Sequence, residues 1–543
     1  MSRPRPLLVA LAVLLVVVAA CTTPDPDATV VRRTGSPASE PGPSADATRP
    51  QEAPASTGGD AGARDPVGPA DPAAHATLTT WSACEDGFEC ATLTVPRRWS
   101  DEDGGTLDLA VVRHRAEGQR IGSLVLNPGG PGASGVDFVR AFVGGSLPDG
   151  LAERFDVVGW DPRGTGRSER IDCTSDEEWL EAEVDPTPDD QADIDAIRAE
   201  SEDAASTCIA EVGDLLELVG TRATVRDLEA LRGALGDEGL SYVGYSYGTT
   251  IGMEYLRLFP DRVRAMVLDG VAVPGAEPIE DSLVQARGFE RALDAYLAGC
   301  ADRPSCTLGD DPKAAMLDLV DRLEAGPIPA DYSYELDGAQ PRPGSLGVGE
   351  LYIAVASALY TEASWPTLDQ GLASARAATP DGRTLLALRD EYLGRQPDGT
   401  WEDDADARGA IRCADQAARS TQPEGDTDLV APWSSELPFW GAWFAVGLPG
   451  CWGLPEAIEP LAPLTDGALT GAPPVVVIGT TNDPATPYEQ SEQAERIIDG
   501  SVLVTFVGDQ HTVYSSQSDC IDDPVTAYLI TLEPPAPGLR CEG

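Results

Sequence analysis

The sequence predicts an α/β fold in which a mostly parallel central sheet is flanked by helices and carries one large helical insertion. Short, nearly continuous apolar runs are typical of parallel strands that are buried on both faces. These runs alternate with segments of helical periodicity, as they do in doubly wound sheets. The alternation stops over residues 272–451, where helical patterns follow one another and we expect no strand.

The predicted core strands are Gly122–Asn127, Phe155–Asp161, Leu240–Tyr245, Val263–Asp269, Pro474–Gly479 and Val502–Val507. The helices predicted between them are Thr224–Leu235, Thr249–Phe259 and Tyr488–Ile498. Within the insertion, periodicity predicts helices at Ser282–Gly299, Pro312–Glu324, Gly347–Tyr360 and Arg383–Leu393. An insertion that follows a strand would cap the crevice where open α/β sheets bind ligands.

The N-terminus predicts export. Arg3 and Arg5 precede an apolar run, residues 7–20, which fits a signal peptide and is too short for a comfortable membrane span. The run ends in Val18-Ala-Ala-Cys21, which resembles a bacterial lipobox and implies a lipid on Cys21. An ordinary signal peptide cut elsewhere is the alternative. The expected organisation is a signal peptide (1–20), a disordered tether (21–78), core segments (79–271 and 452–543) and a cap (272–451).

Cysteine usage also indicates an extracytoplasmic protein, held by its lipid at the outer face of the membrane or cell envelope. Of 11 cysteines, ten remain when Cys21 is set aside. They form couples that are near in sequence, which predicts the disulfides Cys84–Cys90, Cys173–Cys208, Cys300–Cys306, Cys413–Cys451 and Cys520–Cys541. A zinc site is the alternative, but no C-x-x-C pair or histidine cluster accompanies them.

The charge of the chain excludes one class of partner. The 543 residues carry a formal net charge of −52, and Lys313 is the single lysine. A surface this acidic repels phosphate backbones, so we expect no nucleic acid partner. It favours solubility, and it would favour a cationic group on a substrate. Composition does not predict an oligomeric state.

The strand Leu240–Tyr245 runs into the sequence Gly244-Tyr-Ser246-Tyr-Gly248. This G-x-S-x-G pattern is typical of a nucleophile elbow, a tight strand-to-helix turn that projects a serine hydroxyl above the sheet. In a chain rich in Gly and Ser the pattern also fits a surface turn. The nucleophile hypothesis therefore requires a base, an orienting acid and an oxyanion hole elsewhere in the chain.

Few residues can supply the base. Of the three histidines, His75 lies in the expected tether, and we expect His114 to be a solvated residue at a strand end. His511 follows the last strand, where the base of such a fold belongs. Asp483 follows the preceding strand and is the predicted acid, with a simple Asx turn before Pro484 as the alternative.

Two further patterns surround these residues. Thr486, Pro487 and Glu489 predict the N-cap, N1 and N3 positions of the next helix, a capping box. The backbone N–H of Tyr247 and that of either Gly129 or Gly130 are the predicted oxyanion donors. Such chemistry needs neither a metal nor an organic cofactor.

The same glycine loop allows a competing interpretation. Gly130-Pro-Gly-Ala-Ser-Gly135 matches the dinucleotide fingerprint G-x-G-x-x-G after a strand. Pro131 would remove a backbone donor from a pyrophosphate loop, and the predicted export argues against a nicotinamide cofactor. The nucleotide interpretation is therefore much the weaker.

Together, Asn127-Pro-Gly-Gly-Pro-Gly132, Trp160–Ser168 and Gly244–Gly248 resemble the proline iminopeptidase-like serine peptidases. The tail from Cys520 to Cys541 resembles the C-terminal region of secreted actinobacterial tripeptidyl aminopeptidases. The resemblance implies an α/β-hydrolase fold, a Ser246–Asp483–His511 triad and release of short N-terminal peptides. Related members are described as carboxylesterases, so small esters are the alternative substrates. A non-catalytic, substrate-binding lipoprotein is a third hypothesis.

Two departures from the family pattern are visible. Gln510 stands before the histidine where the family often has Gly, and Pro128 replaces a His as in the tripeptidyl branch. We interpret Asp161 and Arg163 as structural residues beneath the site. An aminopeptidase must also bind the ammonium group of its substrate, and acidic residues of the cap could do so. Asp269, at a strand end, is a weak candidate for this role, and a structural role is the better interpretation of it.

Overall fold

The computed structural model describes residues 71–175, 188, 191–332, 342–395, 400–401, 404–416, 425–447, 451, 453–515 and 518–542. The predicted signal peptide, Cys21 and most of the predicted tether lie outside these residues. The end of that tether is structured, because Pro72–His75 form a 3₁₀-helix and Thr77–Leu78 pair with a strand of the main sheet. The predicted range 21–78 therefore reaches too far.

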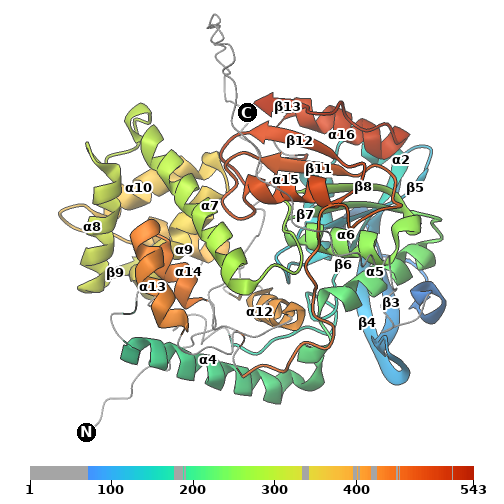
Figure 1. Cartoon of the computed structure of the whole chain (residues 1–543), viewed down its shortest axis with the longest axis horizontal. Coiled ribbons are helices and arrows are strands. Elements are labelled where there is room, and N and C mark those ends of the chain that lie inside the picture. Colours follow the sequence, from blue (N-terminus) through green and yellow to red (C-terminus); the bar gives the residue numbers. More distant parts are fainter. Residues whose placement is uncertain are drawn as a thin grey trace, which may run out of the picture.

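One large sheet forms the hydrolase part of the molecule, which lies to the right in Figure 1, with the helices of the insertion to the left. Its strands are β1 (Thr77–Leu78), β2 (Ser82–Ala83), β3 (Glu89–Arg98), β4 (Asp101–His114), β5 (Gly122–Asn127), β6 (Phe155–Trp160), β7 (Leu240–Tyr245), β8 (Val263–Asp269), β11 (Val476–Thr480), β12 (Val502–Val507) and β13 (Arg540–Glu542). The order is β1-β3-β4-β6-β5-β7-β8-β11-β12-β13, with β2 paired to β3. Neighbours from β6 to β13 are parallel, whereas β3, β4 and β6 pair antiparallel. The predicted fold class is confirmed.

Helices cover both faces of the sheet. One face packs against α5 (Thr221–Leu235), α6 (Tyr247–Leu258) and α15 (Tyr488–Ile497). The other packs against α1 (Gly135–Gly145), α2 (Asp149–Arg154) and α16 (Asp519–Thr531). Within β5, Val125 joins the first core, while Leu124 and Leu126 join the second. Because both faces are buried, each central strand is a nearly continuous apolar run in the sequence.

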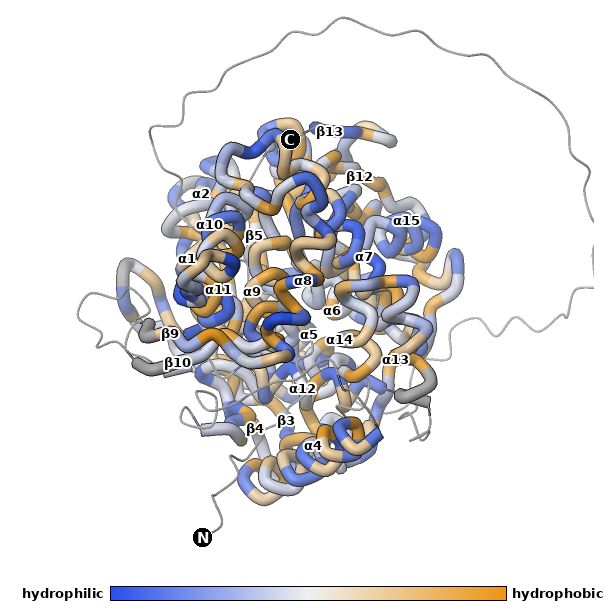
Figure 2. Tube along the Cα trace, turned by 90° about the vertical axis from the view of Figure 1, so that its left-hand side faces the viewer, coloured by the Kyte–Doolittle hydropathy of each residue, from blue (hydrophilic) through white to orange (hydrophobic). Residues whose placement is uncertain are grey.

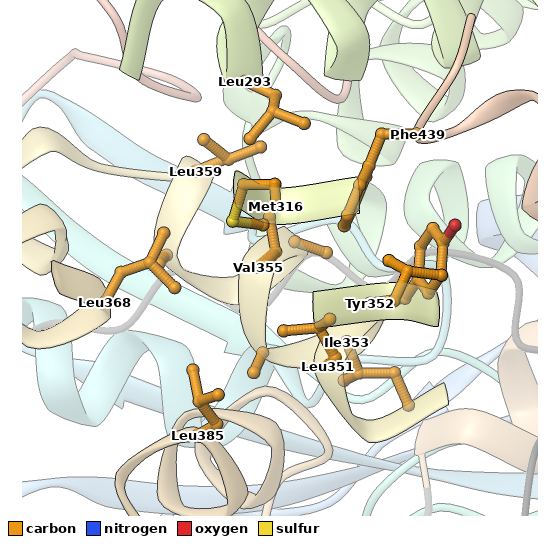
Figure 3. Packing of buried hydrophobic residues seen from close by; sticks show 14 of the residues in the cluster. Leu293, Met316, Leu351, Tyr352, Ile353, Val355, Leu359, Leu368, Leu385 and Phe439 are labelled. Carbon is orange, nitrogen blue, oxygen red and sulfur yellow. The ribbon is translucent and has the colours of Figure 1, made fainter. Parts of the chain in front are cut away.

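The chain between β8 and β11 forms the insertion. Its helices are α7 (Pro278–Ala298), α8 (Pro312–Glu324), α9 (Val348–Leu359), α10 (Trp365–Ala375), α11 (Arg383–Tyr392), α12 (Asp404–Asp415), α13 (Gly425–Glu436) and α14 (Gly441–Val446). Side chains of α9 occupy the centre of the cap, with Met316 of α8, Leu368 of α10 and Leu385 of α11 around them (Figure 3). The cap therefore has its own hydrophobic core, which also holds Trp365, Trp433, Trp440 and Trp443.

Figure 2, which is coloured by hydropathy, shows α9 as a hydrophobic segment near the centre of the molecule. The helix α4 (Gln191–Val212) lies at the edge of the molecule in the same view. One prediction about the insertion is wrong. It contains an antiparallel pair of strands, β9 (Ile328–Tyr332) and β10 (Arg342–Leu346), where no strand was expected. The helix α12, which was not predicted, packs against the core that α5 and α6 share and does not join the cap's own core.

Five disulfides join the ten described cysteines. The pairs are Cys84–Cys90, Cys173–Cys208, Cys300–Cys306, Cys413–Cys451 and Cys520–Cys541. Such a set is typical of proteins outside the reducing cytoplasm. None of the helices in the described ranges has the length and apolar character needed to span a bilayer.

Candidate active site

The turn at Ser246 is strained. Ser246 has φ 53° and ψ −124°, a conformation that non-glycine residues rarely adopt, and it links β7 directly to α6. Both flanking glycines are needed, because a Cβ on Gly244 would strike the carbonyl group of Gly248, and one on Gly248 would approach Asn127 to 2.8 Å. The Ser246 backbone N–H donates to the Asp269 carbonyl of β8 at 2.9 Å. This is the geometry of a nucleophile elbow.

The structure brings His511 and Asp483 together at the same edge of the sheet. Asp483 follows β11 and His511 follows β12, and these two strands are parallel neighbours. His511 Nδ1 lies 2.9 Å from Asp483 Oδ1 and 2.8 Å from Oδ2, and both side chains are buried. The carboxylate therefore fixes the imidazole with Nδ1 as the donor.

The other ring nitrogen of His511, Nε2, faces no polar partner among the described residues. Within the described part of the chain, Nε2 is buried and has no hydrogen-bond partner, and no hydrogen bond joins it to Ser246 Oγ. Bonds of this kind often tighten only when substrate binds. Ser246 lies at the end of β7, separated from β11 only by β8, so the three residues share one edge of the sheet.

Thr486 does not have its predicted role. The helix α15 begins at Tyr488 with Pro487 at the N-cap, so the predicted capping box is absent. Thr486 Oγ1 instead donates to Asp483 Oδ2 at 3.0 Å and lies 3.2 Å from His511 Nδ1. Asp483 Oδ1 also accepts the backbone N–H groups of Ala485 and Thr486, at 2.9 and 2.8 Å. Asp483 therefore makes both the Asx turn and the contact with His511. The position of Thr486, three residues after Asp483, was the sequence signal that could have indicated the bond between their side chains.

The cap contacts the histidine loop. The backbone N–H of His511 donates to the carbonyl of Tyr360, just after α9, at 2.9 Å. The Tyr360 ring stands edge-on to the imidazole at 5.2 Å. Gln510, the departure from the family pattern, donates to the Thr512 carbonyl at 2.9 Å and so braces a residue with φ 57°. Sequence reasoning missed Tyr360, since nothing local connects it to His511.

Asp269 is structural. Its side chain is fully buried, and Oδ2 accepts the backbone N–H groups of Val513 and Tyr514 at 2.8 and 2.7 Å. Its backbone carbonyl accepts from Ser246. Asp269 therefore ties the elbow to the loop that follows His511, and it is not placed to meet a substrate ammonium.

The glycine loop after β5 lies against the elbow. Gly129 and Gly130 have φ values of 98° and 106°, and a Cβ on Gly129 would lie 3.0 Å from the backbone N of Tyr247. The Gly129 N–H already donates to Asn127 Oδ1 at 3.0 Å. Tyr247 opens α6, where the first N–H groups of a helix have no intrahelical acceptor.

A cavity of about 220 Å³ opens at Ser246 and extends beneath the cap. Its floor includes Gly130, Ser246 and Tyr247, and its walls include residues from the start of α7 and from α12. Among the described residues, the charged ones that line it are Glu277, Asp281, Arg412 and Asp415. The described ranges contain no group of three or more His, Cys, Asp or Glu side chains that could hold a metal ion.

The remaining motif residues lie away from the cavity. His75 is exposed in its 3₁₀-helix, while His114 is only partly exposed and contacts the Phe88 ring at 5.6 Å, so it is less solvated than expected. Arg163 pairs with Asp227 in the core, both side chains being almost fully buried. Asp161 accepts the hydroxyl of Ser134, the N-cap residue of α1, at 2.6 Å. Both motif residues are structural, as predicted.

Asp269→Asn should alter how stability depends on pH. Burial raises the pKa of Asp269 to about 7, against the opposing effect of the Tyr514 and Val513 N–H groups. The unfolded carboxyl titrates near pH ~4, so the stability that the protonated folded form provides is full below that pH and is lost as pH rises through about 7. Relative to the variant, the wild type should lose on the order of 1–4 kcal/mol of unfolding free energy between pH ~4 and pH ~8.

Urea unfolding across that pH range measures the effect. Asp261→Asn, at an exposed position just before the same strand, is the matched control and should track the wild type. Parallel stability profiles for the wild type and Asp269→Asn would contradict the prediction.

Known proteins give the same picture of the fold. Residues 122–516 match the family model described as alpha/beta hydrolase fold. The chain is 39% identical over 471 residues to serine protease Hip1 of Mycobacterium tuberculosis, covering 84% of this chain and 87% of that protein. It is 35% identical over 479 residues to carboxylesterase B of the same species, covering 85% and 89% of the two chains.

A third relative is the tripeptidyl aminopeptidase of Streptomyces lividans, 31% identical over 469 residues, with 84% of this chain and 83% of that protein covered. The resemblance inferred from the motifs is thus confirmed across most of the chain. By its sequence and its sheet, this chain belongs to the α/β-hydrolase fold family.

Proposed function

We propose that this protein is an extracytoplasmic serine hydrolase that releases short peptides, in the first place tripeptides, from the free N-termini of its substrates. The observation that carries the proposal is a strained serine beside a buried His–Asp pair at one edge of the sheet. Ser246 follows β7, Asp483 follows β11 and His511 follows β12. The relatives named serine protease and tripeptidyl aminopeptidase support the peptidase reaction.

In the proposed mechanism, His511 Nε2 takes the proton of Ser246 as Oγ attacks the carbonyl carbon of the scissile bond. Asp483 keeps the Nδ1 proton in place and stabilises the imidazolium that forms. The tetrahedral intermediate collapses as His511 gives its proton to the leaving amine, which leaves an acyl-enzyme. His511 then deprotonates a water molecule, and hydrolysis restores the serine.

The oxyanion would be held by the backbone N–H groups of Tyr247 and Gly130. The sequence alone did not decide whether Gly129 or Gly130 is the second donor. The N–H of Gly129 is occupied by Asn127, whereas Gly130 lines the cavity beside Ser246. Gly130 is therefore the better second donor, and Gly129 provides the close backbone approach.

Ser246→Ala should abolish hydrolysis and covalent labelling by a fluorophosphonate probe. Removing the nucleophile of a Ser–His–Asp triad lowers kcat by on the order of 10⁴- to 10⁶-fold. Ser206→Ala, at an exposed serine of α4, is the control and should label like the wild type. Stoichiometric labelling of the Ser246→Ala protein would refute the nucleophile assignment.

Ester hydrolysis is the second candidate function, because one relative is named carboxylesterase B. The same triad would serve it, but it needs no site for a substrate ammonium. A tripeptide anilide with a free amine, its N-acetylated form and a short acyl ester separate the two functions. Higher kcat/KM for the blocked peptide or the ester would count against the aminopeptidase, and preference for the ester would favour the esterase.

We also propose that a lipid on Cys21 anchors the enzyme to the outer face of the membrane. The support is the Val18–Cys21 sequence, which lies outside the described residues, together with the five disulfides of the exported body. Full-length protein made in a bacterial host should partition with the detergent phase, and Cys21→Ser should move it to the aqueous phase. Unchanged partitioning of the variant would argue against the lipid.

A further inference from the structure

The cavity at Ser246 contains two charged side chains, Asp281 and Arg412, that make no hydrogen bond or ion pair with the described residues. Asp281 lies in the first turn of α7, and Arg412 lies on α12. Both line the cavity and both are half-buried. Within the described ranges, neither side chain makes a hydrogen bond or an ion pair, although the two charges influence each other. Half-buried charges without a partner are costly unless something binds them.

The other charged residues of the cavity differ from this pair. Asp415 accepts the backbone N–H and the hydroxyl of Thr221, at 2.7 and 2.6 Å, so its oxygens are committed to the fold. Glu277 is exposed. Neighbouring polar side chains are also in use: Gln285 donates to the Ala485 carbonyl at 2.8 Å, and Gln490 accepts the Val273 N–H at 2.9 Å. Among the described residues, Asp281 is therefore the half-buried carboxylate of the cavity that remains available to a ligand.

An ordinary structural explanation for Asp281 is insufficient. A carboxylate in the first turn stabilises a helix through the helix dipole. Glu280 already supplies that charge in the same turn, and it is exposed, whereas Asp281 faces the cavity. Burial raises the pKa of Asp281, and the positive charge of Arg412 opposes this rise.

We propose that Asp281 binds the α-ammonium of the peptide substrate and is the residue that restricts the enzyme to free N-termini. This inference rests on the proposed function, because it names the recognition group of the same site. An ammonium in the cavity would supply Asp281 with its missing partner. Arg412 then faces the carbonyl oxygens of the same peptide, since a guanidinium can only donate hydrogen bonds. The cavity thereby selects a ligand with a cationic end, which a simple acyl ester lacks.

The test compares kcat/KM for a tripeptide anilide with a free amine and for its N-acetylated form. The wild type should prefer the free amine. In Asp281→Asn this preference should fall by about 10- to 100-fold, mainly through KM, because one charge-assisted contact is lost. Asp281→Glu, which keeps the charge, should recover part of the preference. Glu280→Gln is the matched control and should keep the wild-type ratio.

Fluorophosphonate labelling separates the two ways to fail. A variant that still labels at Ser246 but keeps the wild-type preference would overturn the role of Asp281, with the proposed function intact. A wild-type enzyme that labels but shows no preference for the free amine would overturn both. If Asp281→Asn does not fold, Asp281→Ser takes its place, and the same ratio of kcat/KM values for the free and the N-acetylated peptide is measured.

Discussion

The site depends on one buried residue that is not part of the proposed triad. Asp269 ends β8, between the strand that leads to Ser246 and the strand that leads to Asp483. Its carbonyl accepts the N–H of Ser246, and its carboxylate accepts the N–H groups of Val513 and Tyr514. Asp269 thus holds both the turn at Ser246 and the loop that carries His511. Since the φ of Ser246 is unfavourable on its own, the surrounding contacts must hold it, and the hydrogen bond to the Asp269 carbonyl is one of them.

The sheet could be predicted because its physics is local. Strands buried on both faces need apolar residues at most positions, and β5, β7, β8 and β12 have the bounds that the sequence predicts. The candidate site could be predicted as well, because Ser246, Asp483 and His511 each come just after such a strand and stand in the expected order along the chain. The structural role of Asp161 and Arg163 could be predicted, although their partners could not, because a buried charge requires a partner.

What the sequence left wrong or undecided depends on side-chain orientation and packing, which a sequence pattern does not specify. Thr486 reads as a helix cap, yet the helix begins two residues later and the hydroxyl binds Asp483. The strands β9 and β10 lie in a stretch whose neighbours are all helical, and α12 is amphipathic without any sign of which core it joins. The choice between Gly129 and Gly130 depends on the side chain of Asn127. Asp281 could not be chosen among the many acidic residues until the cavity was visible.

The hydrogen bond from His511 to Tyr360 has a consequence for protein engineering. A minimal hydrolase made by deleting the cap would remove the acceptor of the His511 N–H and the ring that stands against the imidazole. The cap could therefore not be exchanged as an independent specificity module unless the graft rebuilt that carbonyl. Chimaeras between relatives should be joined so that α9 and the histidine loop come from the same parent.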